Sequence, residues 1–108
     1  MRIYNVICAE KHYDQGEQPC INEVHSTSNS ETAKKLFFEE VENSLDCILN
    51  DDDYKINSEK GTIWISDEVD CEIDYDCNFN HNVNFWYFLY WDGNDSYKVV
   101  IQQTDLLD

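Results

Sequence analysis

The chain has 108 residues, of which 42% are hydrophobic and 14% aromatic. This is enough apolar side chain for one modest core, and it argues against a disordered chain. The 23 acidic residues outnumber the 7 lysines and arginines, giving a net charge of −16 that repels nucleic-acid phosphates and anionic membranes. We expect a single domain over residues 1–108 whose charge serves a cationic partner, a metal ion or solubility alone.

The cysteines indicate a reducing compartment. Their number is odd, and the opening MRIYNVICAEKHYD reaches charged residues too soon to hold the apolar segment of a secretory signal. No apolar run is long enough to span a bilayer. We therefore expect a cytoplasmic protein whose thiols are free and pack as small hydrophobes: Cys8, Cys20, Cys47, Cys71 and Cys77.

The first half of the chain predicts two strands and a helix. Residues 2–9 and 20–26 are rich in β-branched and aromatic residues and read as paired strands, separated by a loop over 10–19. Ser28 and Glu31 have capping-box spacing, which predicts a helix over about residues 29–49. With a helical period, one apolar stripe faces the core: Ala33, Leu36, Phe37, Val41, Leu45 and Ile48. The charged residues off this stripe are expected to face water: Lys34, Lys35, Glu39, Glu40 and Glu42.

The second half predicts strands. Residues 54–57 and 62–66 flank the turn signal SEKG and indicate a hairpin, and residues 68–77 alternate with period two. Residues 83–91 are apolar on both faces and predict the central, most buried strand, and a DGND turn leads to a closing strand over 96–103. The fold class is α+β, a mostly antiparallel sheet of about five to six strands with one long helix on one face.

An acidic row is the strongest functional signal. In VDCEIDYDC (69–77) every second residue is a carboxylate, namely Asp70, Glu72, Asp74 and Asp76. On a strand these four would project to one face at a spacing of ~6.6 Å, while Val69, Cys71, Ile73, Tyr75 and Cys77 line the core. DNA also presents a regular row of charge, with one phosphate per ~3.4 Å of axis on each strand. Such a strand could stand in for one strand of nucleic acid.

A solvated outer face is the competing interpretation of this row. Solvated faces usually mix charges of both signs, because like charges side by side repel. Here no lysine or arginine interrupts the four acids. Other acidic residues could widen the face if the fold brings them to the same side: Asp51, Asp52, Asp53, Asp92 and Asp95.

Metal sites and catalytic motifs find little support. Asp92, Asn94 and Ser96 begin like a calcium loop, but Tyr97 and Gln103 stand where that loop needs a glycine and a glutamate. The run Asp51–Asp53 and the set Cys71, Cys77 and His81 are weak candidates for metal binding. No phosphate loop, nucleophile elbow or H-E-x-x-H motif accompanies the histidines His12, His25 and His81. We expect no metal, no cofactor and no enzymatic activity.

The aromatic run FWYFLYW raises the question of what covers its second face. Phe85, Tyr87, Leu89 and Trp91 would point one way, and Trp86, Phe88 and Tyr90 the other. One side should pack under the helix. The other side is either covered by loops or packs against a partner or a second copy of the chain, since interfaces favour Trp and Tyr.

The order of elements supports a resemblance. MRIYNVICAEKHYD followed by VHSTSNSETAKKLFFEEVENSL resembles small acidic proteins encoded by phages and other mobile elements. The chain is similar in size and charge to anti-CRISPR and anti-restriction proteins, several of which mimic nucleic acid. The resemblance implies a cytoplasmic inhibitor of a host defence nuclease.

We therefore expect an acidic inhibitor that binds the nucleic-acid-binding groove of a nuclease or CRISPR effector, and that binds no nucleic acid or membrane itself. The expected partner-binding residues are Asp70, Glu72, Asp74, Asp76, Asp51, Asp52, Asp53, Asp92 and Asp95. Two alternatives stay open: an immunity protein that neutralises a basic nuclease toxin, and a non-enzymatic module that dimerises through its aromatic strand.

Overall fold

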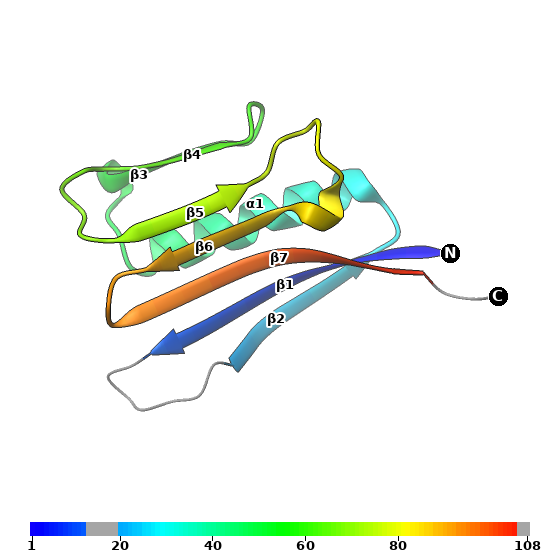
Figure 1. Ribbon diagram of the computed structural model, residues 1–108, viewed down its shortest axis with the longest axis horizontal. Helices are drawn as coiled ribbons and strands as arrows, with labels where there is room; N and C mark the ends of the chain where they lie inside the picture. The colour runs from blue at the N-terminus through cyan, green and yellow to red at the C-terminus, as the bar shows by residue number, and fades with distance from the viewer. Residues whose placement is uncertain (13–19, 106–108) are drawn as a thin grey trace.

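The computed structural model describes residues 1–12 and 20–105. Residues 13–19 of the predicted loop therefore lie outside the described part. Within this part, five strands form one antiparallel sheet and a long helix packs on one of its faces (Figure 1). The predicted α+β class is confirmed. Residues 10–12, predicted as loop, instead continue the first strand.

The sheet has the strand order β2-β1-β7-β6-β5, and every neighbouring pair is antiparallel. The strands are β1 (Arg2–His12), β2 (Cys20–Thr27), β5 (Glu72–Asp76), β6 (Tyr87–Trp91) and β7 (Asp95–Asp105). The central strand is β7, because β1 pairs with it on the side opposite β6. The prediction that residues 83–91 form the central strand is therefore wrong. Residues Val83–Phe85 form the short 3-10 helix η3 and only the remainder joins the sheet.

The helix α1 (Ser30–Asp46) begins one residue later than the predicted cap implies. Asn29 is the N-cap, and its side-chain Oδ1 accepts hydrogen bonds from the backbone N–H groups of Glu31 (2.8 Å) and Thr32 (3.2 Å). Asparagine caps as well as serine does, and here it satisfies two orphan donors. The predicted capping box at Ser28 is therefore wrong. The apolar stripe is confirmed, with these members buried: Ala33, Phe37, Val41 and Leu45.

The core lies between α1 and the inner face of the sheet. Trp86 is 1% exposed, and its ring meets those of Phe37 and Phe38 at centroid distances of 5.5 and 5.7 Å. Its indole N–H donates to the carbonyl of Asn78 at 3.0 Å, so the buried polar atom has a partner. Phe88 and Tyr90 on β6 are buried on this same side.

A separate hairpin, β3 (Tyr54–Asn57) with β4 (Thr62–Ile65), follows α1 and the 3-10 helix η2 (Asp51–Asp53), as the sequence predicts for these strands. Gly61 in its turn has φ +68°, and a Cβ there would lie 2.4 Å from the carbonyl oxygen of Cys77. Only glycine fits this approach. The Cys77 thiol donates to the Gly61 carbonyl at 3.1 Å, so the turn is held against the chain just after β5.

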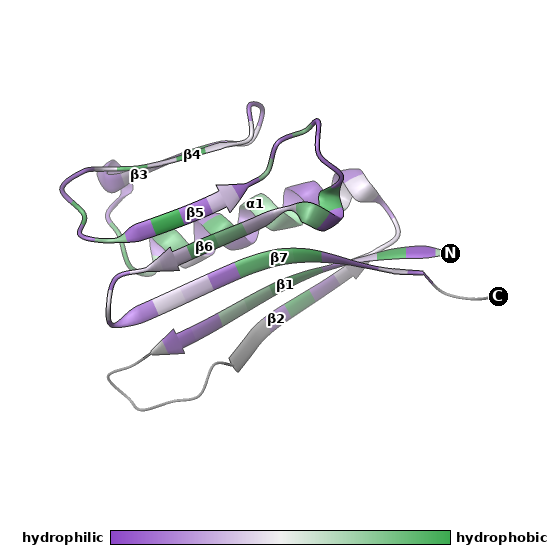
Figure 2. Ribbon diagram, in the orientation of Figure 1, coloured by the Kyte–Doolittle hydropathy of each residue, from purple (hydrophilic) through white to green (hydrophobic). Residues whose placement is uncertain are grey.

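The outer face of the sheet is not covered by α1 (Figure 1). Leu89 and Trp91 point to this side and are 38% and 46% exposed, whereas their neighbours Phe88 and Tyr90 are buried. The predicted division of the aromatic run between two faces is confirmed. Figure 2 shows hydrophilic and hydrophobic residues alternating along β5, as expected for a strand with one solvated side. No helix in the described part is long and apolar enough to cross a membrane.

Candidate functional site: the open face of the sheet

Three of the predicted carboxylates share the outer face of β5. Glu72, Asp74 and Asp76 alternate along this strand with the half-buried Ile73 and Tyr75. Because alternate residues share a face, the three form a file with a spacing of ~6.6 Å. β5 is an edge strand and pairs with β6 on one side within the sheet.

Asp70 does not belong to that strand, contrary to the prediction that residues 68–77 form one element. Ser66 starts a turn instead, because its carbonyl accepts from Val69 N–H at 3.1 Å and its hydroxyl from Glu68 N–H at 3.3 Å. β5 therefore starts only at Glu72. Asp70 is exposed in the segment that leads into the strand, so it lies next to the file without sharing its regular spacing.

Local hydrogen bonds orient two carboxylates of the file. Asp74 accepts from the Tyr87 hydroxyl at 3.2 Å. Asp76 accepts from Asn78 N–H at 3.1 Å and contacts His81 Nδ1 at 2.7 Å. The hydrogen bond from Asn78 N–H and, to a smaller extent, the contact with His81 hold the pKa of Asp76 below its ordinary value. Asp76 therefore stays anionic at neutral pH.

Apolar side chains lie directly beside the file. In the antiparallel register, Glu72 is opposite Trp91, Asp74 opposite Leu89, and Asp76 opposite Tyr87. Directly opposed residues on one face are close enough to act together on a ligand. Phe85, which precedes the strand in η3, is 66% exposed and extends this apolar surface.

The open face is hollowed, and two lysines, Lys11 and Lys98, are among the residues that line the hollows. Two neighbouring hollows of about 580 and 500 Å³ share Asp74, Leu89 and Lys98 among the residues that line them. Lys98 lies on β7 in register with Leu89, so it is two strands away from the file on the same face. No ion pair joins Lys98 to the file in the described residues. We call the exposed surface of Glu72, Asp74, Asp76, Tyr87, Leu89 and Trp91 the acidic-aromatic face.

The other predicted acidic residues lie elsewhere. Asp51–Asp53 form η2 after the helix, and Asp51 lines a groove between α1 and β3. Asp92 is used in the β6–β7 turn, where its carboxylate accepts from the N–H groups of Asn94 (2.9 Å) and Asp95 (2.8 Å) and from the Tyr90 hydroxyl (3.0 Å). The predicted turn is confirmed, and this fully bonded carboxylate serves it.

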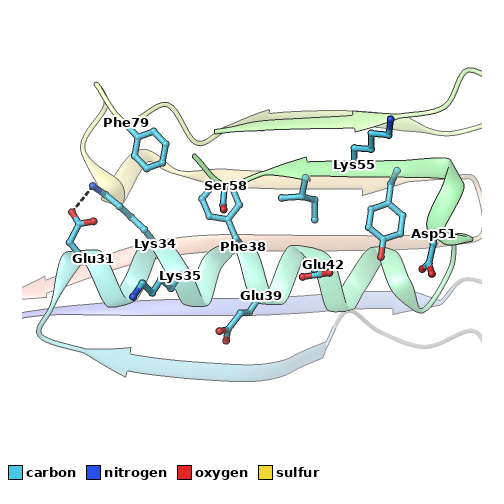
Figure 3. Close-up of a pocket in the computed structure, with 12 residues that line it drawn as sticks. Glu31, Lys34, Lys35, Phe38, Glu39, Glu42, Asp51, Lys55, Ser58 and Phe79 are labelled. Atoms are coloured by element: carbon cyan, nitrogen blue, oxygen red, sulfur yellow. Dashed lines mark hydrogen bonds and ion pairs between the residues drawn. The ribbon is translucent and has the colours of Figure 1, made fainter. Parts of the chain in front are cut away.

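A groove of about 800 Å³ lies between α1 and β3 and is shown in Figure 3. Its lining mixes lysines (Lys34, Lys35 and Lys55) with carboxylates (Glu31, Glu39, Glu42 and Asp51), so its charge favours no single class of ligand. Lys34 was predicted to face water, but it is half-buried. Its ammonium contacts Glu31 at 2.9 Å and lies 5.4 Å from the centre of the Phe79 ring.

A third group of titratable side chains joins β2 to α1. His25 Nε2 lies 2.9 Å from Glu23 Oε2 and 3.1 Å from Glu40 Oε1. Glu40 was predicted to face water, but it is 6% exposed. It lies one turn from Phe37 on the side of the helix that faces β2, and the chain pattern alone could not show that a strand covers that side. In the described residues these three form the one group whose ligand atoms lie close enough to hold a metal ion.

The buried thiols offer little nucleophilic chemistry. Cys8 and Cys77 are buried, and Cys47 and Cys71 are not in disulfides. Burial raises the pKa of the Cys77 thiol to about 12, so it is protonated at neutral pH. Cys77 belongs to the buried core and Cys71 packs against it, whereas the ring of His81 contacts Asp76.

No protein-family model matches this chain, and neither a curated protein nor a solved structure matches it.

Proposed function

We propose that this protein is a non-enzymatic inhibitor that binds the nucleic-acid-binding groove of a basic nuclease with its acidic-aromatic face. One observation carries the proposal. A file of carboxylates on β5 lies in register with the apolar and aromatic side chains of Tyr87, Leu89 and Trp91 on β6, of which Leu89 and Trp91 are exposed, on a side of the sheet that the helix leaves open.

This combination is what a single strand of nucleic acid presents to a protein. Proteins that bind single strands combine a basic groove, which follows the phosphates, with aromatic side chains on which bases stack. Glu72, Asp74 and Asp76 would meet the basic groove, and Trp91 and Tyr87 would meet the stacking platforms. The chain's net charge of −16 also speeds encounter with a basic partner.

The proposed partner class is a host defence nuclease, either a CRISPR effector or a restriction nuclease, which the protein would meet in the cytoplasm of the host cell. This choice rests on the resemblance to small acidic phage proteins. An immunity protein against a basic nuclease toxin would use the same electrostatics. The same charge disfavours self-association through this face, because it would bring together two chains that each carry −16.

The test measures nuclease inhibition with two charge-reversal variants. The first, Glu72→Lys with Asp74→Lys, alters the file, and the second, Asp51→Lys with Asp52→Lys, alters exposed acids of η2. Each reversal replaces −1 by +1, so both variants carry −12 instead of −16. The purified proteins are assayed against CRISPR effectors, restriction nucleases and nuclease toxins, with circular dichroism to confirm folding.

We expect at least one nuclease to be inhibited at equimolar protein, with inhibition lost on competition by a single-stranded oligonucleotide and weakened by salt. Like charges facing one another cost several kcal/mol. The file variant should therefore inhibit on the order of a hundredfold more weakly, since about 1.4 kcal/mol is tenfold. The proposal fails if no nuclease in the panel is inhibited, or if both variants lose inhibition equally, because net charge alone would then explain the effect.

A further inference from the structure

The cluster of Glu23, His25 and Glu40 lies away from the acidic-aromatic face. Glu23 and His25 are two residues apart on β2, so both side chains point to the inner side of the sheet. Glu40 reaches them from α1. The two elements thus direct three metal-ligating groups to one point, and all their ligand atoms lie within 4.8 Å of one another.

His25 alone cannot donate a hydrogen bond to both carboxylates of this cluster at once. A histidine ring nitrogen carries at most one proton, and His25 Nε2 faces one oxygen of each glutamate at 2.9 and 3.1 Å. The proton can be donated to one carboxylate at a time, so the other has no donor from His25. No lysine or arginine pairs with either glutamate in the described residues.

Burial makes this deficit costly at Glu40. Its side chain is 8% exposed, whereas those of Glu23 and His25 are 54% and 40% exposed. A buried carboxylate next to a second one is stabilised by a shared proton or by a cation, and a cation can contact both carboxylates and His25 at the same time.

We propose that Glu23, His25 and Glu40 bind a divalent transition-metal ion, of which Zn²⁺ is the representative. Zinc bonds of about 2.0–2.2 Å to nitrogen and oxygen place tetrahedral ligands ~3.3 Å apart. The contacts of 2.9 and 3.1 Å from Nε2 need to lengthen by only a few tenths of an ångström. An imidazole ligand favours such ions over Mg²⁺ and Ca²⁺, which prefer oxygen.

The exposure of Glu23 and His25 leaves the ion reachable from solvent, so a water molecule can complete its coordination. The bound ion would link the edge strand β2 to α1. Because an ion that binds only the folded state stabilises it, Zn²⁺ should raise the melting temperature.

The test is calorimetric titration of the full chain, stripped with a chelator, using Zn²⁺ and, separately, Mg²⁺. Glu40→Gln keeps the shape of the buried side chain and removes its charge, and His25→Gln removes the nitrogen ligand at a half-exposed position. His81→Gln is the matched control, because His81 also contacts a carboxylate, that of Asp76, at 2.7 Å. Thermal unfolding with and without Zn²⁺ gives a second readout.

We expect one strong Zn²⁺ site in the wild type and in His81→Gln, with little binding of Mg²⁺. Loss of a ligand should weaken Zn²⁺ binding by at least about tenfold in Glu40→Gln and in His25→Gln. Both variants should also lose the Zn²⁺-dependent rise in melting temperature. If Glu40→Gln does not fold, His25→Gln alone decides. Absence of strong Zn²⁺ binding, equal affinity in His25→Gln, or loss of binding in His81→Gln instead would each overturn the proposal.

Discussion

Replacing Gly61 by alanine tests how the β3–β4 hairpin is attached to the rest of the fold. Gly61 has φ +68°, and an added Cβ would lie 2.4 Å from the backbone carbonyl oxygen of Cys77. Gly93, in the β6–β7 turn, has φ +93° but nothing within 4 Å of an added Cβ. Gly93→Ala therefore also places an alanine at positive φ, but without the close contact.

Both substitutions place an alanine at positive φ, and Gly61→Ala adds the close contact. Left-handed backbone costs a non-glycine residue about 1–2 kcal/mol, and restriction of the unfolded chain by alanine returns about 0.4–1 kcal/mol. Gly93→Ala should therefore lose about 1 kcal/mol. A backbone clash forces a displacement that costs about 1–3 kcal/mol more. It also strains the hydrogen bond from the Cys77 thiol to the Gly61 carbonyl. We expect a total loss of about 2–4 kcal/mol for Gly61→Ala.

Urea unfolding measures the loss of unfolding free energy in each variant, and thermal unfolding measures its melting temperature. Both are monitored by tryptophan fluorescence, because Trp86 is 1% exposed and reports on the core. Each 1 kcal/mol corresponds to a shift of about 4–8 °C in melting temperature for a domain of this size. Gly61→Ala should melt at least about 4 °C below Gly93→Ala. Equal losses would show that the turn does not press on Cys77, and would refute this account of the hairpin.

Two further predictions concern buried groups. Cys77 should resist alkylation by iodoacetamide at pH 8 in the folded protein, since burial raises its pKa to about 12, whereas the exposed Cys47 should react; peptide mass mapping checks this, and early modification of Cys77 would contradict its burial. Asp92→Ala should lower the free energy of unfolding by about 1–2 kcal/mol at pH 7, because it removes the acceptor of three hydrogen bonds. Asp92→Asn should lose less, because its amide oxygen still accepts some of these bonds. Although partial burial raises the pKa of Asp92, the N–H groups of Asp95 and Asn94 hold it below its ordinary value. The carboxylate's contribution is thus present above about pH 4 and is lost as the pH falls through the lowered pKa. Urea unfolding at pH 7 and pH 3 should show a smaller difference between wild type and Asp92→Ala at pH 3, and an undiminished difference would contradict this assignment.

Local patterns in the sequence predicted much of the secondary structure. The apolar stripe of Ala33, Phe37, Val41 and Leu45 and the turn at Asp92 depend on side chains close together in the chain. The alternation at Glu72, Asp74 and Asp76 likewise required only the two-residue period of a strand. Both errors at strand ends have local causes that compete with this period: the Ser66 turn shortens the acidic strand, and η3 shortens the aromatic one.

The sequence alone was sufficient to determine the α+β class, the outward direction of the acidic file and the split of the aromatic run into two faces, because each follows from helical or strand period. Tertiary structure decided what those faces meet. Pairing of β5 with β6 placed the carboxylates beside Leu89 and Trp91, and the order of strands left that side open. Packing of α1 against β2 buried Glu40 beside His25, a contact across 15 residues of chain. Such contacts arise from the shape of the whole core, which no local pattern of residues encodes.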